Sequence, residues 1–208
     1  MIITVDGPSA AGKGTIARAI AKRLGYHFLD TGSLYRMVGL AMLKAGKSGD
    51  DEASATAFAN ALDPASVREE ELRSENVAAM ASKVAAIPLV RQALLDYQRQ
   101  FAKRQPGAVL DGRDIGTVVC PDADLKFFVT ASTEVRAKRR FEELKSLGQK
   151  VDYESVLEDV MARDERDASR ITAPTRPADD AILIDTSELT REEVLGAVMD
   201  IIAEHRKG

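Results

Sequence analysis

Short apolar runs alternate along this chain with longer segments in which apolar residues recur every three or four positions. The runs are typical of buried strands in a parallel sheet. They cover residues 2–5, 26–29, 108–110, 125–129 and 181–184. The helical spacing between them predicts helices over residues 13–24, 31–46, 76–86, 89–104, 133–147, 152–169 and 190–205. This alternation predicts an α/β fold with a five-stranded parallel sheet flanked by helices.

Two segments depart from this pattern. Residues 47–73 are rich in Ala, Asp, Glu and Ser and contain few large apolar residues, so we expect an inserted lobe that is helical, exposed and lightly tied to the core. Residues 172–180 contain two prolines and no apolar periodicity. We therefore expect this second segment to be mobile.

Composition narrows the class of protein. A chain of 208 residues with 45% hydrophobic content is long enough for one buried core, and a net charge of -4 argues against a nucleic-acid partner. The single Cys120 cannot form an internal disulfide, and no Cys/His spacing is suited to zinc. There is no apolar run of about 20 residues and no signal-peptide pattern at the N-terminus. We expect a cytoplasmic protein, most simply a monomer, without a membrane partner.

The strongest chemical signal is a glycine-rich segment between the first strand and the first helix. Two glycines five residues apart are followed directly by a lysine, which is the spacing of a P-loop. Small residues let the backbone N–H groups turn toward phosphate oxygens at a helix N-terminus, where Lys13 reaches the transferred phosphate. A flexible Gly/Ala turn would not explain the strand, the spacing and the lysine together. The predicted nucleotide-binding residues are Gly7, Pro8, Ser9, Ala10, Ala11, Gly12, Lys13, Gly14 and Thr15.

The same segment and the third predicted strand offer candidate metal ligands. Gly14 stands where many such loops place a hydroxyl that holds magnesium, and Thr15 comes one residue later. Asp111 follows the third predicted strand, as does the acidic residue with which other P-loop enzymes organise magnesium and its waters. Thr15 and Asp111 are therefore the candidate Mg²⁺ residues, with contact through water left open.

Several further segments resemble one family of kinases. G-K-G-T is similar to the loop of nucleoside monophosphate kinases. The segments D-T-G-S-L-Y-R (residues 30–36), S-K-V-A-A-I-P-L-V-R (82–91), D-G-R-D-I-G-T-V-V (111–119) and R-D-E-R-D-A-S-R (163–170) resemble the bacterial cytidylate kinases, in order and over nearly the whole chain. The resemblance implies a P-loop NTPase fold and transfer of the terminal phosphate of ATP, with Mg²⁺, to CMP or dCMP. The products would be CDP or dCDP.

The resemblance also implies roles for individual residues. Arg36 and Arg113 would hold the acceptor's monophosphate. Both residues lie just beyond a predicted strand end, where ligands bind in parallel sheets, and a guanidinium can bind a phosphate through two N–H groups. Ser82, Arg91 and Asp114 would surround the cytosine. An ionised Asp114 can accept from the exocyclic amino group of cytosine, whereas uracil presents a carbonyl there. The alternative is that Asp114 caps a turn, and a lone arginine in such a place is more often a solvated surface charge.

The last segment carries a further group of charged residues. Arg163, Asp167 and Arg170 are spaced to share one helix face, and by resemblance Arg163 and Asp167 approach the ribose hydroxyls and Arg170 the base. Thr31 would lie near the acceptor, although helix capping explains it equally well. The residues implied to act in catalysis are Lys13, Arg36, Arg113 and Arg163. The candidates for a closing lid are Arg136, Arg139, Arg140 and Arg166.

By resemblance, the chain forms a single nucleoside monophosphate kinase domain. We expect a core of about residues 1–46, 87–148 and 181–208, an NMP-binding lobe of about 47–86 and a helical lid of about 149–180. Many bacterial cytidylate kinases have a longer lobe with β-strands, and residues 47–73 show no alternating β pattern. We therefore expect a small, helical lobe, which leaves the preference between CMP and dCMP open.

Two other functions remain to be weighed. A kinase of the same fold could act on UMP, AMP or another small metabolite, which assays with different acceptors would reveal. A GTPase-like switch is the alternative from another class, but no N-K-x-D segment is present to read guanine, and the several arginines suit a second phosphorylated substrate better.

Overall fold

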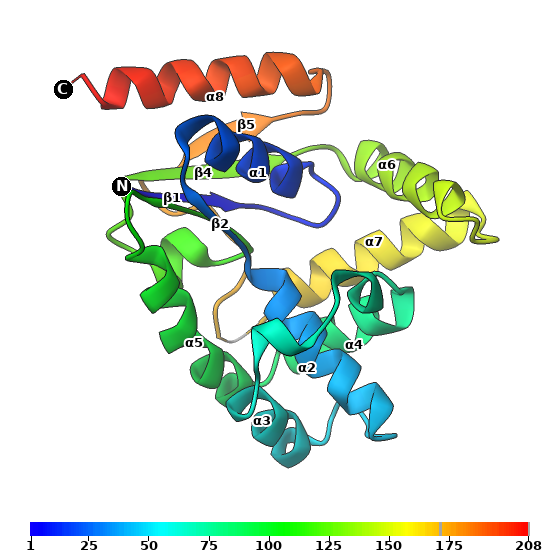
Figure 1. Ribbon diagram of the computed structural model, residues 1–208. Coiled ribbons are helices and arrows are strands. Elements are labelled where there is room, and N and C mark those ends of the chain that lie inside the picture. Colours follow the sequence, from blue (N-terminus) through cyan, green and yellow to red (C-terminus); the bar gives the residue numbers. More distant parts are fainter. Residues whose placement is uncertain (171, 208) are drawn as a thin grey trace. The chain divides into compact units, whose positions relative to one another are not determined.

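The computed structural model describes residues 1–170 and 172–207, and its centre is a five-stranded sheet of order β2-β3-β1-β4-β5 (Figure 1). The strands are β1 (Ile2–Asp6), β2 (His27–Asp30), β3 (Ala108–Asp111), β4 (Leu125–Thr130) and β5 (Ile182–Asp185). β1 pairs in parallel with β3 and β4, and β4 pairs in parallel with β5. The predicted α/β fold with a five-stranded sheet is therefore confirmed.

The chain divides into two compact units. The first contains Met1–Leu29 and Ala102–Gly208, and the second contains Asp30–Phe101. The lobe expected at about residues 47–86 lies inside the second unit, and the lid expected at about 149–180 lies inside the first. Residues 171 and 208, which fall in the ranges expected for the lid and the core, lie outside the described residues.

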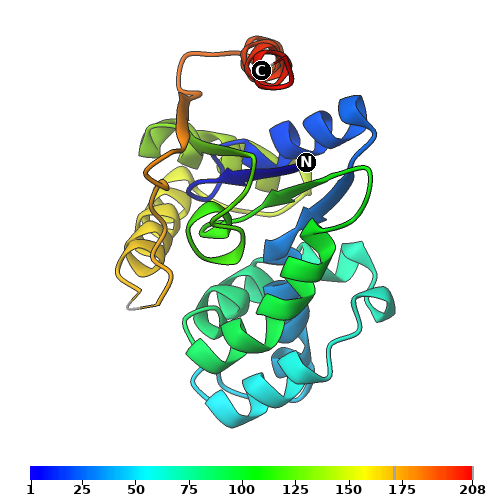
Figure 2. The same cartoon turned by 90° about the vertical axis from the view of Figure 1, so that its left-hand side faces the viewer.

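In the first unit, helices α1 (Lys13–Leu24) and α8 (Arg191–His205) cover one face of the sheet (Figures 1 and 2). Their apolar residues recur at helical spacing, so each helix presents one stripe to the strands. Ile16, Ala17 and Ile20 of α1 share a buried cluster with Val194 and Val198 of α8. This packing fixes the start of α1, where the glycine-rich loop ends.

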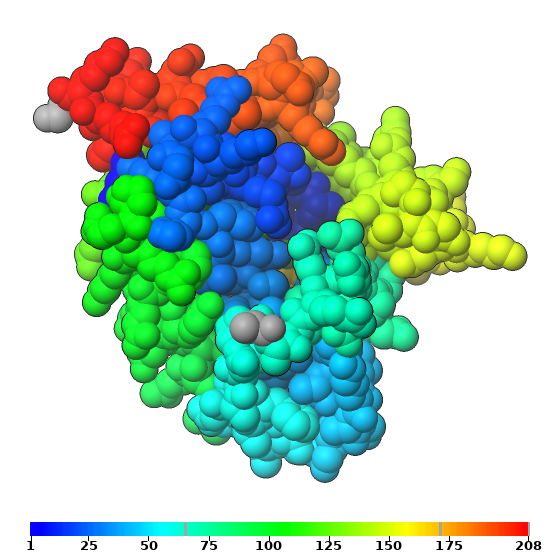
Figure 3. All heavy atoms as spheres, in the orientation of Figure 1, coloured from blue at the N-terminus to red at the C-terminus, as the bar shows by residue number. Residues whose placement is uncertain are grey.

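Helices α6 (Thr133–Ser146) and α7 (Tyr153–Ala168) pack against each other and project beyond the rest of the first unit (Figures 1 and 3). Ser132 and Asp152 cap their N-termini by accepting backbone N–H bonds from Val135 and Ser155. The α6–α7 hairpin carries all four arginines that the sequence suggested for a lid.

The second unit is helical and is built around α2 (Thr31–Lys44) and α4 (Glu75–Val84). A Cβ atom on Gly39 of α2 would lie 2.9 Å from the backbone nitrogen of Ala81 in α4, so glycine allows the two helices to approach closely. Helix α5 (Pro88–Ala102) adds Val90 and Leu94 to the same core. The predicted junction between α4 and α5 at Pro88 is confirmed.

Residues 47–73 are helical, as predicted. They form α3 (Glu52–Asn60) and two short 3-10 turns, η1 (Pro64–Ser66) and η2 (Glu69–Leu72). Ala55, Ala59 and Leu72 are buried, while most other side chains in this stretch are exposed or half-buried. Ala55 and Ala59 therefore attach α3 to the core of the unit, and the partly buried Phe58 packs against the same core.

A test for membrane-spanning helices over residues 1–170 and 172–207 finds no single helix that is long and apolar enough. Helices α4 and α5 reach the required length and hydropathy only when they are taken as one segment, and that segment is bent by 99°.

One element was not predicted. After β3 the chain forms a π-helical turn, η3 (Ile115–Val119), instead of a loop. Its sequence I-G-T-V-V has neither the length nor the periodicity of a helix, so the pattern of apolar residues could not reveal it. Tertiary contacts to β1, described below, hold it in place.

Gly7, directly after β1, occupies a place where no other residue fits. Its φ is 146°, and a Cβ atom there would lie 1.9 Å from the carbonyl oxygen of Val129 in β4. Both the backbone conformation and the contact exclude an L side chain. The glycine-rich loop therefore starts from a point at which the chain presses against the neighbouring strand.

We predict that Gly7→Ala lowers the free energy of unfolding by about 2 kcal/mol or more, because the chain must leave its conformation or push β4 aside. Urea unfolding measures this. The control is Gly196→Ala in α8, where a Cβ meets no atom within 4 Å and should stabilise the helix by up to about 1 kcal/mol. Equal effects of the two variants would contradict the assignment.

Candidate functional site

The loop of residues 7–12 connects β1 to α1 through strained backbone. Ala10 has a φ of 58° and Gly12, which precedes α1, has a φ of 88°. A positive φ is uncommon for alanine, and residues held in this way are frequent where a ligand is bound. No side chain caps the start of α1, so the N-terminus of this helix is left to a ligand or solvent.

The carbonyl groups of the loop are held from outside. Arg136 donates to the Ser9 oxygen (3.3 Å) and Thr186 donates to the Ala11 oxygen (3.1 Å). Lys13 Nζ lies 3.5 Å from the oxygen of Pro8. In a trans peptide the N–H points opposite to the C=O, so each anchored carbonyl turns the following N–H to the other side of the loop. This is the arrangement that an anion-binding loop requires.

Two arginines proposed for a lid build this support. Arg136 is buried, forms an ion pair with Asp164 of α7 (2.6 Å), and donates to the Ala131 oxygen and the Thr133 hydroxyl. Arg139 donates twice to Thr186, at 2.9 and 2.7 Å. Arg140 pairs with Glu143, one turn along α6. In this structure Arg136 and Arg139 thus join the α6–α7 hairpin to the loop and to the end of β5.

Sequence reasoning missed Thr186 and Asp164. Thr186 directly follows β5, at the carboxyl end of the sheet. Ligands bind at this edge in parallel sheets, so its position after a predicted strand could have marked it as a candidate site residue. Asp164 stands in a helix with many charges, where nothing in the sequence distinguishes it from a solvated residue. Only the fold shows that it faces Arg136.

Lys13 and Asp111 meet at the carboxyl end of the sheet. Asp111, the last residue of β3, is buried, and its Oδ1 lies 3.7 Å from Lys13 Nζ. A Cβ atom on Gly14 would lie 2.8 Å from Asp111 Oδ2. The glycine that departs from the general P-loop pattern therefore makes room for this carboxylate.

The candidate metal residues are consistent with a hard cation that is only partly held by protein. Thr15 is exposed in the first turn of α1, and the Asp111 carboxylate lies against the same turn. Oxygen donors of this kind suit Mg²⁺, which keeps several waters and shares phosphate oxygens. No cluster of three or more His, Cys, Asp or Glu side chains suited to a metal occurs in the described part of the chain. The ligation of Mg²⁺ by Thr15 and Asp111 stays a prediction.

Asp6, the last residue of β1, is a further buried carboxylate. Its Oδ1 accepts the N–H of Ile115 (2.8 Å) and its Oδ2 accepts the N–H of Gly116 (2.7 Å). Burial raises the pKa of Asp6 to about 7, opposed by these two bonds and reinforced by the charges of Asp114 and Asp111. The sequence analysis assigned no role to this residue.

Asp114 lies at the start of η3 and is buried. Its side chain makes no capping hydrogen bond to the turn, and Asp6 accepts the first two N–H groups of the turn, those of Ile115 and Gly116. The alternative that Asp114 simply caps a turn is thus disfavoured. A carboxylate at this position can accept a hydrogen bond from a donor on a ligand.

Arg113, Asp167 and Arg170 form one charged cluster in the first unit. Arg113 Nε lies 3.0 Å from Asp167 Oδ2, and Arg170 pairs with the other carboxylate oxygen. Burial raises the pKa of Asp167, but the charges of Arg113, Arg170 and Arg163 outweigh it, and the pKa falls below its usual value. Helix α7 ends at Ala168, so Arg170 lies beyond the helix face on which it was predicted. It nevertheless meets Asp167.

The other predicted acceptor ligands belong to the second unit. Arg36 donates to the Leu72 oxygen at 3.0 Å. Arg91 is buried, donates to the Ala85 oxygen, and has its guanidinium 5.5 Å from the centre of the Tyr35 ring. Ser82 and Thr31 are also buried, and Asp30, rather than Thr31, caps α2 by accepting from the Ser33 N–H. Helix capping therefore does not account for Thr31.

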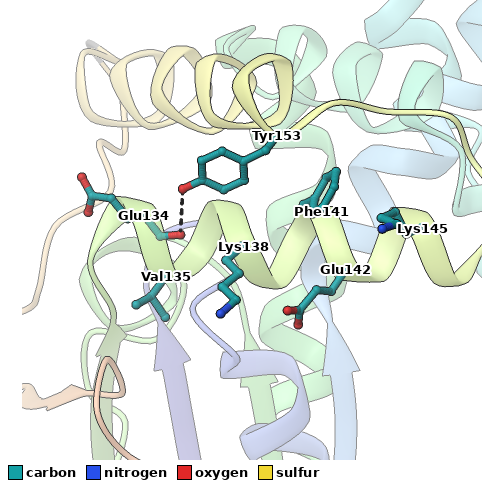
Figure 4. Close-up of a pocket in the computed structure, with 7 residues that line it drawn as sticks. All are labelled: Glu134, Val135, Lys138, Phe141, Glu142, Lys145 and Tyr153. Atoms are coloured by element: carbon teal, nitrogen blue, oxygen red, sulfur yellow. Dashed lines mark hydrogen bonds between the residues drawn. The ribbon is translucent and has the colours of Figure 1, made fainter.

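A pocket of about 590 Å³ opens on the α6–α7 hairpin (Figure 4). The Tyr153 ring meets Phe141 edge to face at 6.1 Å, and Lys145 lies 5.1 Å from the centre of the Phe141 ring. Lys138 and Glu142 extend from the same side of α6 in this view. The pocket lies on the hairpin that supports the loop, although none of the loop residues lines it.

The sequence was compared with protein families and with curated proteins to identify the family of this chain. A family model described as cytidylate kinase matches residues 3–204. The chain belongs to the cytidylate kinase family. It is 53% identical over 207 residues to the cytidylate kinase of Rhodospirillum rubrum, covering 98% of this chain and 97% of that protein. It is 54% identical over 206 residues to the cytidylate kinase of Azorhizobium caulinodans, covering 99% and 100% of the two chains.

These comparisons confirm the resemblance found in the sequence motifs. The coverage also shows that these cytidylate kinases are about as long as this chain. Solved structures of an uncharacterized protein from Eubacterium ventriosum (TM-score 0.56, 13% identity, 98% of both chains) and of TT1252 from Thermus thermophilus (0.51, 19%, 98% and 97%) share the fold. At such low identities they show the fold alone.

The contact between Gly14 and Asp111 can be tested by a double-mutant cycle. Gly14→Ala places a methyl group against the carboxylate, so we expect no gain, or a loss of up to about 1 kcal/mol, in the free energy of unfolding. In an Asp111→Ala background the obstacle is gone, and alanine should stabilise the first turn of α1 by up to about 1 kcal/mol. Urea unfolding of the four proteins measures the coupling. The same effect in both backgrounds would show that Gly14 does not accommodate Asp111.

Proposed function

We propose that this protein transfers the terminal phosphate of ATP to CMP or dCMP and releases CDP or dCDP. The observation that carries the proposal is the group formed in the first unit by the anchored loop, Lys13, Asp111 and the buried Asp114. The loop suits a triphosphate, and Asp114 supplies an acceptor of hydrogen bonds that a cytosine amino group can use. Membership of the cytidylate kinase family supports both assignments.

The donor is assigned to the loop of residues 7–15. Its N–H groups and the N-terminus of α1 would bind the phosphates, and Lys13 would reach the phosphate that is transferred. Asp111 keeps Lys13 at this end of the sheet through their 3.7 Å contact. Thr15 and Asp111 would hold Mg²⁺, directly or through water, which would supply positive charge to the donor phosphates.

The resemblance assigns the acceptor's phosphate, ribose and base to individual residues. Arg36 and Arg113 would bind its phosphate, and Arg163 and Asp167 its ribose, with Thr31 near the acceptor. Arg113 is already oriented by Asp167 and by the Gly112 oxygen, so its guanidinium is held before the substrate arrives. Ser82, Arg91, Asp114 and Arg170 are assigned to the base. Catalysis by this group of residues is positioning and charge stabilisation, without a covalent intermediate on the protein.

The acceptor preference is the direct test of the proposal. With ATP as donor, we expect kcat/KM for CMP or dCMP to exceed the values for UMP and AMP by about 10-fold or more, because uracil offers no amino donor to Asp114 and the purine of AMP is larger than a pyrimidine. A coupled assay of ADP release measures this. Lys13→Ala should abolish the signal and so exclude a contaminating kinase. Better turnover of UMP or AMP would refute the cytidylate assignment.

Asp114→Asn tests the basis of that preference. An amide can donate to the uracil carbonyl as well as accept from cytosine, so the ratio of kcat/KM for CMP to that for UMP should fall by about 10-fold or more. Asp122→Asn is the matched control, because Asp122 is exposed and lies eight residues further along the same segment. An unchanged ratio in Asp114→Asn would remove this residue from base recognition.

A further inference from the structure

Asp6 is a buried carboxylate for which the proposed chemistry has no use. It is 5% exposed and directly precedes the phosphate loop. Its two oxygens face η3, where they accept the N–H groups of Ile115 and Gly116 at 2.8 and 2.7 Å. These residues are 109 and 110 positions away in the chain, so the contact is tertiary.

The contact acts on the residue next to it. Asp114 precedes Ile115, and its φ of -142° and ψ of 25° are outside the regular helical and extended regions. On the C-terminal side, its carbonyl oxygen accepts the N–H of Val118 at 2.9 Å. With the next two N–H groups bound to Asp6, the backbone of Asp114 is fixed between two sets of hydrogen bonds. The position of its side chain then depends on Asp6.

The close approach of η3 to β1 requires a glycine. A Cβ atom on Gly116 would lie 3.0 Å from Thr4 Oγ1, 3.2 Å from Lys126 Cδ and 3.4 Å from Asp6 Oδ2. A methyl group there would push the turn away from the Asp6 carboxylate by a few tenths of an ångström. Gly116 thus offers a second, independent means of disturbing the same contact.

We infer that Asp6 is a positioning residue that fixes Asp114 for the recognition of cytosine. This inference rests on the proposed function. A carboxylate suits the role because both of its oxygens accept, whereas an asparagine would direct its NH₂ group at one of the two N–H donors. Burial, together with the charges of Asp114 and Asp111, raises the pKa of Asp6, and the two hydrogen bonds oppose this rise only in part.

A competing role is support of the phosphate loop, because Gly7 follows Asp6 in the chain. The two roles predict different defects. Loss of loop support would weaken ATP binding for every acceptor, whereas displacement of Asp114 would change the choice between CMP and UMP.

The test compares Asp6→Asn and Gly116→Ala with the control Asp124→Asn. Asp124 accepts the N–H of Ile2 at the other end of β1, in an exposed contact of 2.6 Å. For each protein, kcat/KM is measured with CMP and UMP at saturating ATP, and the Kd of ATP is measured separately. We expect the CMP-to-UMP ratio to fall by about 10-fold in Asp6→Asn and by a smaller factor in Gly116→Ala. The Kd of ATP should change by less than about 2-fold, and the control should match the wild type.

Each outcome separates the hypotheses. A wild-type protein that does not prefer CMP would refute the proposed function itself. A wild-type preference that survives unchanged in Asp6→Asn and in Gly116→Ala would overturn the positioning role. A weaker affinity for ATP with an unchanged ratio would assign Asp6 to the loop instead. If Asp6→Asn does not fold, Gly116→Ala alone decides between these results.

Discussion

The close approach of Gly7 to the carbonyl oxygen of Val129 is the constraint on which the phosphate loop depends. A Cβ atom would lie 1.9 Å from that oxygen, so the chain can leave β1 here only as glycine. From this point the loop is held by its carbonyl groups, through Arg136 at Ser9 and Thr186 at Ala11. The shape of the loop is therefore imposed by β4, α6 and the end of β5, and the Gly/Ala sequence merely permits it. Preorganisation of this kind lowers the cost of binding a polyanion.

Three cations of the first unit, at the phosphate loop or assigned to the acceptor, are each paired with a carboxylate. Lys13 meets Asp111, Arg113 meets Asp167, and Arg136 meets Asp164. Each carboxylate fixes a long, flexible side chain and balances its charge. A bound phosphate would add to these pairs, because an ammonium or a guanidinium has more donors than one carboxylate uses. The unit thus holds positive charge in defined positions, which suits a reaction whose transition state spreads negative charge over phosphate oxygens.

The sequence predicted the strands, most helices and the loop because each leaves a local pattern. Periodicity located α1, α6 and α8 to within a residue or two, and the spacing of Gly7, Gly12 and Lys13 identified the loop. Contacts between distant segments leave no such pattern. The turn η3 depends on Asp6, and the anchoring of Ala11 depends on Thr186, which is 175 residues away. The family motifs named Asp114 and Arg113, yet they could not show that Asp6 and Asp167 hold them.

In the sequence, glycines suggest a loop that is free to wrap around phosphates. In the structure, three of them are required because other groups lie close to their Cα atoms. At Gly7, Gly14 and Gly116 a Cβ atom would lie 1.9, 2.8 and 3.0 Å from the Val129 carbonyl oxygen, the Asp111 carboxylate and the Thr4 hydroxyl, closer than ordinary van der Waals contact. Position 14 does not carry the hydroxyl residue of other P-loops, because the Asp111 carboxylate occupies the space that its side chain would need. The next position, Thr15, is then the first in α1 that can offer a hydroxyl. One glycine thereby links the end of β3 to the phosphate loop, and the sequence G-K-G-T follows from the geometry of a carboxylate 97 residues further along the chain.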